Sequence, residues 1–563
     1  MNRDAPPPRN VLILGAAGRD YHLFNTVYRR QTRAANGADA SGADGYNERG
    51  APAASEASLG PAGANGGGPA PDPSSDRAPD RVVCFTHAQI PFIESKAYPA
   101  ALCGAGYPRD GIPIVPERDL EAAVAAHGVR ACVFAYSDVS HEQLGALSAR
   151  VRRAGCDFVL PAAGAGGPGD PSTLRSTRPV VAVTAVRTGC GKSQVCARVA
   201  EAARSAGVRV ALVRHPMPYG DLERMRVQRF ASLTDLDTQG ATVEEREEYE
   251  QHLERGVVVF AGVDYGAILR EAEKEADVII FDGGNNDTPF YRPDLDLCVC
   301  DPFRPRAHET HYPGGINFAR AGHLVVNKAN TAPREGVAAV LAAAAALNPA
   351  ARVYVTDSRV TLRLAGAAAT GAAAGGGGTG PEGGAAEKSA ATADANAAAA
   401  IAFVRGKRAL CVDDGPTITH GGLATGAAVV AAREAGCAEV VDPRPFFRGA
   451  VAEALAKYPH IGLTVPALGY GPEQVRDLAA TIRAAVSGTG AEVVVVGTPT
   501  DLSRVLGPAS SGDGGGWSAG APVVRATYAV EEREGGGGLG AMLDAWFAEK
   551  RREMDAAAKA AEN

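Results

Sequence analysis

The sequence has no long apolar run, no concentrated basic segment and no regular cysteine spacing. No run approaches the roughly 18 apolar residues that a membrane-spanning helix needs, so we expect no membrane partner. The net charge is −7 and the charged residues are interspersed, so we expect no nucleic-acid partner. The ten cysteines are scattered, several inside apolar runs, and lack zinc-site spacing. This distribution favours buried thiols in a reducing cytosol over disulfides or zinc.

Two segments consist mostly of alanine, glycine, proline and serine, at residues 34–80 and 364–400. They contain almost nothing large enough to bury, so we predict a disordered insertion at 34–80 and a low-complexity linker at 364–400. The first expected strand begins at residue 11, after residues rich in proline and charge. That leaves no room for a secretory presequence, and we expect a cytoplasmic protein.

Short apolar, β-branched runs alternate with alanine-rich segments along the whole chain. Examples are PVVAVTAV (179–186), DVIIFDGG (277–284) and EVVVVGTP (492–499). Continuous apolar strands separated by helices are typical of parallel sheets covered on both faces, so the predicted class is α/β. Breaks in composition predict a Rossmann-like N-terminal domain, a central P-loop NTPase domain with a parallel sheet and a C-terminal α/β domain, at residues 9–161, 178–360 and 405–550.

The segment TAVRTGCGKSQ (184–194) lies between a predicted strand and a predicted helix. It ends as a phosphate-binding loop does, but Val186 stands where the usual pattern has its first glycine. In such a loop glycines let the backbone wrap the β-phosphate, a lysine contacts the β/γ oxygens, and a hydroxyl binds Mg²⁺. The predicted nucleotide contacts are Thr188, Gly189, Cys190, Gly191, Lys192, Ser193 and Gln194, with Lys192 also catalytic and Ser193 also a metal ligand.

One branch of P-loop proteins has the loop Lys-Gly-Gly-x-Gly-Lys-Ser/Thr, with a second cation five residues before the main lysine. RTGCGKS (187–193) resembles this branch, with Arg187 in the place of that cation. The resemblance implies a catalytic role for Arg187. Because that branch often works as pairs of subunits, it also implies a homodimer.

Two further segments complete the predicted nucleotide site. Asp282 follows four apolar residues in DVIIFDGG, where it could hold Mg²⁺ directly or through water, or cap the following turn. VVNKAN (325–330) resembles the Asn-Lys-x-Asp motif with which GTPases read guanine, so Asn327, Lys328 and Asn330 are predicted base contacts. Asn330 replaces the carboxylate that accepts two hydrogen bonds from guanine, so the predicted nucleotide is ATP or GTP.

Other polar clusters follow predicted strands. RHPMPYGDL (214–222) lies where residues that sense the γ-phosphate usually occur, and DPFRPRAHETHYPGG (301–315) carries two arginines. Arginines facing a nucleotide would suit a second anionic substrate. EEREEYE (244–250) is either a solvated charged helix or a functional face, and VDDGPTITHGG (412–422) either contacts a ligand or forms a polar turn. The residues predicted to clamp the acceptor are Arg214, His215, Arg304 and Arg306.

A series of motifs in fixed order resembles the cyclic 2,3-diphosphoglycerate synthetase family and its wider set of predicted GTPases. The motifs are GAAGRDYHLFN, AVRTGCGKSQ, RHPMPYGDL, EEREEYE, AGVDYG, FDGGNND, DPFRP…HE…YPGG, NKAN, VDDGPTITHGG and TPTDLSR. The resemblance covers essentially every segment outside the low-complexity tracts. It implies a P-loop enzyme that uses ATP to close an intramolecular phosphoanhydride in a bisphosphate.

We therefore predict a Mg²⁺-dependent P-loop enzyme that transfers the γ-phosphoryl group of ATP or GTP to a small, anionic, phosphorylated substrate. The alternative from another class is a GTP-hydrolysing switch or metal-delivery GTPase, which the NKAN segment favours. A regulatory protein with a degenerate nucleotide site is the third possibility, and the intact Gly191-Lys192-Ser193 and Asp282 count against it.

Overall fold

The structure is a computed structural model, and its chain forms two compact units. The N-terminal unit contains residues 1–16, 20–135 and 146–161, and the main unit contains residues 17–19, 136–145 and 162–563. The residues that the structure describes are 8–16, 18–29, 80–88, 96–104, 106–162, 172–284, 287–364, 395–419, 421–469, 471–509, 516–536 and 538–562. The predicted insertion at 34–80 therefore lies outside the described residues, apart from Asp80.

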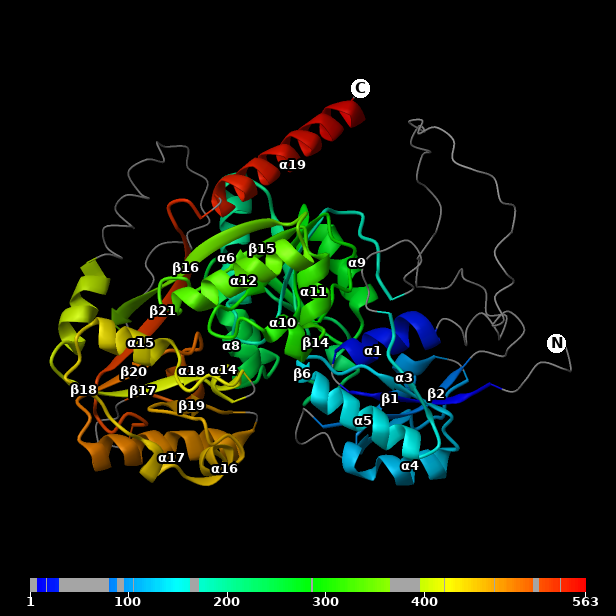
Figure 1. Ribbon diagram of the computed structural model, residues 1–563, viewed down its shortest axis with the longest axis horizontal. Coiled ribbons are helices and arrows are strands. Elements are labelled where there is room, and N and C mark those ends of the chain that lie inside the picture. Colours follow the sequence, from blue (N-terminus) through cyan, green and yellow to red (C-terminus); the bar gives the residue numbers. More distant parts are fainter. Residues whose placement is uncertain are drawn as a thin grey trace, which may run out of the picture. The chain divides into compact units, whose positions relative to one another are not determined.

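A six-stranded sheet forms the N-terminal unit, in the order β3-β4-β2-β1-β5-β7 (Figure 1). Its strands are parallel except β3, which runs antiparallel to β4. The sheet is covered by helices such as α4 (Leu120–His127) and by the buried ring of Phe24, whose centroid lies 5.8 Å from that of Phe85 in the sheet. The strands are β1 (Asn10–Leu14), β2 (Arg81–His87), β3 (Ala97–Tyr98), β4 (Ile112–Pro116), β5 (Ala131–Phe134) and β7 (Asp157–Val159).

The main unit is built on one sheet, whose first half carries the P-loop. The order there is β10-β11-β9-β12-β8-β13-β15-β16, and all pairs are parallel except β10 with β11. Every residue of β8 and β12 is buried, which is why these strands read as unbroken apolar runs. The strands are β8 (Val180–Ala185), β9 (Val210–Val213), β10 (Gln228–Phe230), β11 (Val258–Ala261), β12 (Val278–Asp282), β13 (Leu295–Cys300) and β15 (His323–Val326).

The predicted central and C-terminal domains share this sheet. The long strand β16 (Arg352–Leu364) pairs in parallel with β15 up to Val355 and antiparallel with β21 (Val523–Glu532) from Thr356 onward. Beyond β21 the order continues β20-β17-β18, with β19 also paired to β17. These strands are β17 (Arg408–Asp414), β18 (Glu439–Val440), β19 (Val465–Ala467) and β20 (Val493–Val496). Figure 1 shows β16 and β21 running from the P-loop half of the sheet to the C-terminal half.

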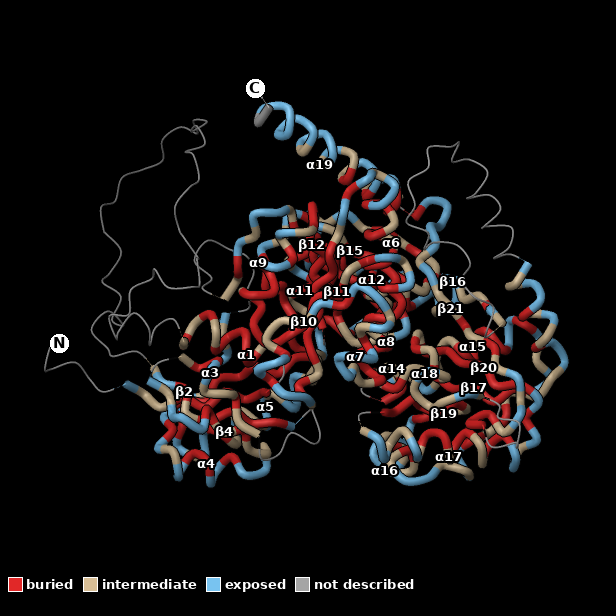
Figure 2. Tube along the Cα trace, turned by 180° about the vertical axis from the view of Figure 1, so that it is seen from behind, coloured by how far each residue is buried: buried red, intermediate tan, exposed pale blue. Residues whose placement is uncertain are grey.

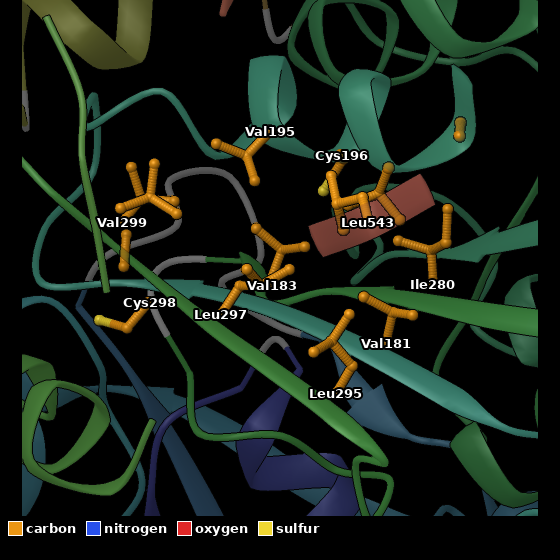
Figure 3. Close-up of a cluster of buried hydrophobic side chains, with 14 of the residues drawn as sticks. Val181, Val183, Val195, Cys196, Ile280, Leu295, Leu297, Cys298, Val299 and Leu543 are labelled. Atoms are coloured by element: carbon orange, nitrogen blue, oxygen red, sulfur yellow. The ribbon is translucent and has the colours of Figure 1, made fainter. Parts of the chain in front are cut away.

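The chain's last helix, α19 (Leu539–Glu562), packs on the P-loop half, whereas the sequence analysis assigned residues up to 550 to the C-terminal domain. Leu539, Leu543 and Phe547 belong to the same buried cluster as Cys196 of α6 (Lys192–Ser205). Figure 3 shows Leu543 beside Cys196, and Figure 2 shows the buried residues concentrated along the strands. A second predicted domain boundary also differs from the structure: residues 395–404 are helical, whereas the predicted linker extends to residue 400.

Nine of the ten cysteines are buried and Cys437 is half-buried, and all ten are free thiols. Within the described part of the chain, no helix combines the length and the apolar character that crossing a membrane requires.

Candidate active site

The P-loop connects β8 to α6, and its glycines are required by its shape. Gly189 and Gly191 have φ of +81° and +104°, in the left-handed region that other residues rarely adopt. A Cβ on Gly191 would lie only 2.3 Å from Nδ2 of Asn327. Val186, in contrast, still follows the sheet, because its N–H donates to the carbonyl of Val299 at 3.1 Å. The absent first glycine thus falls where the backbone has not yet left the strand direction.

Asp282 ends β12, the strand next to β8, and is 0% exposed. Its Oδ2 accepts a hydrogen bond from Arg214, whereas Oδ1 has no partner among the described residues. Burial alone would raise the pKa of Asp282, but the charges of Arg214 and Lys192 outweigh it and hold the pKa below its ordinary value. A buried ionised oxygen without a donor fits a bound cation, and Ser193 in the first turn of α6 supplies a hydroxyl. These residues fit Mg²⁺.

Arg214 was predicted to bind the acceptor, but its guanidinium contacts carboxylates of the protein itself. Its guanidinium, 4% exposed, lies between Asp282 and Glu248 of α8 (Val243–Leu253), with Nε donating to Glu248 at 2.7 Å. Its charge is thus already balanced by two carboxylates. His215 is also buried, and its Nδ1 has no hydrogen-bond partner among the described residues. Burial, aided by Arg214 and Lys192, lowers the pKa of His215, so the ring is neutral at pH 7.

Arg304 and Lys328 bind the outside of the P-loop. Arg304 Nη2 donates to the carbonyl of Thr188 at 2.8 Å, and Lys328 Nζ donates to the carbonyl of Gly189. Both cations also contact buried Asp301, at 2.8 and 3.1 Å. Arg304 is further bonded to the carbonyl of Gly421, in the C-terminal half of the unit. These two residues therefore fix the loop's backbone.

Arg306, predicted to act with Arg304, lies elsewhere. Its side chain is 78% exposed and forms an ion pair with Glu309 at 2.6 Å. The two arginines are separated by one residue in the turn that follows β13, and of the two Arg304 contacts the P-loop. The predicted acceptor clamp of four residues is therefore not assembled in this structure.

The NKAN segment joins the P-loop to the sheet. Asn327 donates through Nδ2 to the carbonyl of Cys190 at 3.3 Å and accepts from Thr356 at 3.1 Å. Asn330, predicted to read the base, instead pairs with the backbone of Ser358: its Oδ1 accepts from the N–H at 3.0 Å and its Nδ2 donates to the carbonyl at 3.2 Å. Gln194 accepts from the Ser358 hydroxyl at 3.0 Å. Each polar atom of the Asn330 amide thus makes one hydrogen bond to the backbone of Ser358, and a role of Asn330 in contacting the base stays a prediction.

The predicted catalytic residue Arg187 pairs with Asp138, which the sequence analysis did not name as a site residue; Arg19 and Asp301 were not named either. Arg187 Nε lies 3.1 Å from Asp138, whose other oxygen accepts from the N–H of Thr188 at 3.3 Å. Arg19, from the GAAGRD turn, donates to Thr288 at 3.0 Å and lies 3.7 Å from Asp287. An acid directly after a buried strand is the signal that could have identified Asp301, and Asp138 lies shortly after β5.

The glutamate-rich helix α8 is not the solvated helix that the sequence left open. Glu244, Glu245, Glu247 and Glu250 are each at most 5% exposed. Glu245 accepts from the N–H of Met217 at 3.0 Å, and Glu250 accepts from the N–H of Asp501 at 2.8 Å. The helix therefore lies inside the main unit, with Glu248 facing Arg214 and other glutamates facing the C-terminal half.

Comparisons with known proteins give one extensive match. No family model matches the chain. The chain is 41% identical over 525 residues to arginine synthetase ArcE of Thermococcus kodakarensis, covering 93% of this chain and 94% of that protein. Among solved structures, LpxK of Aquifex aeolicus in complex with ATP is 12% identical with a TM-score of 0.32, covering 64% of this chain and 87% of that one.

Proposed function

The chain belongs to the family of arginine synthetase ArcE, and from that premise we propose that it is an ATP-dependent synthetase that forms arginine. The identity of 41% over 93% of this chain carries the proposal. The intact Gly191-Lys192-Ser193 at the start of α6, with Asp282 on the neighbouring strand, supports ATP as the energy source. A synthetase couples the joining of two molecules to cleavage of such a nucleotide.

The covalent structure of arginine indicates which molecule accepts the γ-phosphoryl group. The guanidinium carbon of arginine carries three nitrogen atoms, whereas the ureido carbon of citrulline carries two nitrogen atoms and one oxygen. Phosphoryl transfer to that oxygen makes it a leaving group, so that a third nitrogen atom can replace it. The ureido oxygen attacks the γ-phosphorus, and the bond to ADP breaks. Ammonia then attacks the carbon, the carbon–oxygen bond breaks, and phosphate leaves with the former ureido oxygen and a proton from the attacking nitrogen. The products are arginine, ADP and phosphate.

Within this proposal the polar residues around the P-loop bind the nucleotide or hold the loop in place. The loop's N–H groups and the Lys192 ammonium neutralise the β/γ oxygens as the bond to ADP breaks. Ser193 and Asp282 would hold Mg²⁺, which when bound supplies further charge neutralisation. Arg214 keeps Asp282 ionised, and Arg304 and Lys328 keep the loop in shape through its carbonyls.

The anhydride-forming enzyme that the sequence predicted, and the GTP-dependent switch that was its alternative, find less support in the geometry. Closing a phosphoanhydride in a bisphosphate needs cations that face the acceptor, but Arg214 is paired with two carboxylates and Arg306 with Glu309. A GTP-dependent switch needs a residue that reads guanine, and the amide of Asn330 is engaged by Ser358. We therefore favour ATP and arginine formation.

The test is product analysis with the full-length protein. With ATP, Mg²⁺, citrulline and ammonium, we expect arginine and ADP in equal amounts, and neither when citrulline is omitted. Lys192→Ala should lower the rate at least about 100-fold, because the ammonium stabilises charge that develops in the transition state. ATP cleavage that depends on a bisphosphate and not on citrulline would favour anhydride formation. Hydrolysis of GTP without either acceptor would favour the switch.

A further inference from the structure

The C-terminal half of the main unit has a strand order that usually marks a ligand site. From central strand β17 the chain goes to β18 and β19 on one side, and then to β20 on the other. In parallel sheets ligands bind outside the carboxyl ends of the strands where the order reverses in this way. Asp414 is the last residue of β17, and Thr498 lies two residues after β20.

Helix α8 places a glutamate at this end of the sheet. Oε1 of Glu247 accepts a hydrogen bond from the hydroxyl of Thr498 at 2.7 Å. Glu247 is 4% exposed, and its Oε2 is buried without a hydrogen-bond donor among the described residues. Figures 1 and 2 both show α8 next to the short C-terminal helices α14 (Gly415–Ile418) and α18 (Leu502–Leu506).

The environment of Glu247 is acidic. Burial, and after it the charge of the Asp414 carboxylate and a hydrogen bond between the two carboxyl groups, raise the pKa of Glu247 well above its ordinary value, and Glu244 acts in the same direction. Asp413, beside Asp414, is already satisfied, since it accepts from the N–H groups of Gly426 and Ala428 at 2.9 and 2.7 Å. Two facing carboxyl groups, one of them with a buried oxygen that lacks a donor, are stabilised by a cationic ligand that brings its own hydrogen bonds.

This acid pair lies next to the nucleotide half of the site. Asp414 accepts a hydrogen bond from Thr417, and a Cβ placed on Gly189 of the P-loop would lie 3.6 Å from the methyl group of Thr417. On α8 the residue after Glu247 is Glu248, which binds Arg214 and through it Asp282. The pair is therefore linked through Thr417 to the neighbourhood of Gly189, and the residue next to it on α8 is linked through Arg214 to Asp282.

We propose that Glu247 and Asp414 form the subsite that binds the guanidinium end of arginine, with Thr498 positioning Glu247. The inference rests on the proposed function, because it assigns that substrate's reactive end to these side chains. A guanidinium is planar and presents several N–H donors in a fixed geometry that matches carboxylates. The ureido group of citrulline is uncharged, so the pair favours the cation that forms as the carbon gains its third nitrogen.

The test compares the affinities of arginine and citrulline for the full-length protein with ADP present, by isothermal titration calorimetry. In Glu247→Gln and in Asp414→Asn we expect arginine to bind about 10- to 100-fold more weakly, since a charge-assisted hydrogen bond is lost. Citrulline should change less than about threefold, and ADP less than about twofold, because neither places a charge on the pair. Glu254→Gln, which removes a carboxylate at the exposed end of the same helix, is the matched control.

Arginine affinity within about twofold of wild type in both variants, with ADP affinity retained, would overturn the subsite and leave the proposed function standing. If Glu247→Gln fails to fold by circular dichroism, the half-buried Asp414→Asn decides the matter alone. Wild-type protein that binds ADP but not arginine would instead remove the proposed function, and the subsite with it.

Discussion

Replacing Arg214 by methionine tests the charge balance beside the predicted Mg²⁺ ligand. Arg214 is 4% exposed and donates to Asp282 and Glu248. Methionine keeps much of the side chain's length but removes the charge, so two carboxylates remain inside the protein without their cation. Breaking a buried ion pair in this way typically costs 3–5 kcal/mol, so we expect the free energy of unfolding of Arg214→Met to fall by about 4 kcal/mol.

The sign of the pH dependence gives this prediction a second measurable consequence. In the wild type, burial alone would raise the pKa of Asp282, but Arg214 and Lys192 hold it below its ordinary value. The ionised Asp282 therefore stabilises the fold at pH values above the ordinary pKa of an aspartate, and this contribution is lost only as the pH falls through the lowered pKa. Without Arg214 burial dominates and the pKa of Asp282 rises above its unfolded-state value of about 3.9. Protonation then relieves the variant, so its deficit should be smaller at pH 5 than at pH 7.

Urea unfolding followed by circular dichroism at both pH values measures the effect. The control is the triple variant Arg214→Met/Asp282→Asn/Glu248→Gln, which removes all three charges and should recover most of the lost stability, because no uncompensated charge remains. A single variant within about 1 kcal/mol of wild type at pH 7 would refute the argument. So would a triple variant no more stable than the single one.

Three further predictions concern the loop, a buried histidine and the NKAN segment. Gly191→Ala should weaken ATP binding at least about tenfold in a calorimetric titration, because φ is +104° and the new Cβ would lie 2.3 Å from Asn327; wild-type affinity would contradict this. Burial lowers the pKa of His252 to about 3, so the unfolded state takes up a proton first as the pH falls below about 6.5 and stability is lost. Between pH 7 and pH 5 the free energy of unfolding of His252→Leu should therefore fall by about 2 kcal/mol less than that of the wild type. An unchanged pH dependence would count against the lowered pKa of His252. Asn330→Asp should lose the donor to Ser358 and about 1–2 kcal/mol of stability without moving the ratio of ATP to GTP affinity, whereas a shift towards GTP would support the base-reading role.

The parallel half of the fold could be predicted because its strands are buried on both faces. The apolar runs at β8 and β12, and the glycines before Lys192, each follow from a local requirement that the sequence displays. Strand β21 was not predicted. It pairs antiparallel with β16, and in VVRATYAVEE only the second and fourth residues are buried while the others are half-buried or exposed, so it lacks the continuous apolar run that marked the other strands. Because β21 was not predicted, the sequence analysis also did not predict that the central and C-terminal domains share one sheet.

Side-chain partners were the least predictable part of the site. Arg214, Arg304 and Arg306 carry the same group but have different partners. Arg214 contacts buried Asp282 and half-buried Glu248, Arg304 contacts two backbone carbonyls, and Arg306 contacts the nearby surface residue Glu309. The burial of α8 was equally hidden, because a run of glutamates has the composition of a solvated helix. Its burial is made possible by partners from distant parts of the chain, namely Met217 and Arg214 in the P-loop half and Thr498 and Asp501 in the C-terminal half.

The central claim is that this site forms arginine through phosphoryl transfer to the acceptor's oxygen. It is tested most directly by the fate of that oxygen. With citrulline labelled by ¹⁸O in its ureido group, incubated with ATP, Mg²⁺ and ammonium, we predict that mass spectrometry finds one ¹⁸O in each phosphate released and arginine in equal amount. Phosphate released without the label would mean that water, and not the acceptor, takes the γ-phosphoryl group, which would contradict the account.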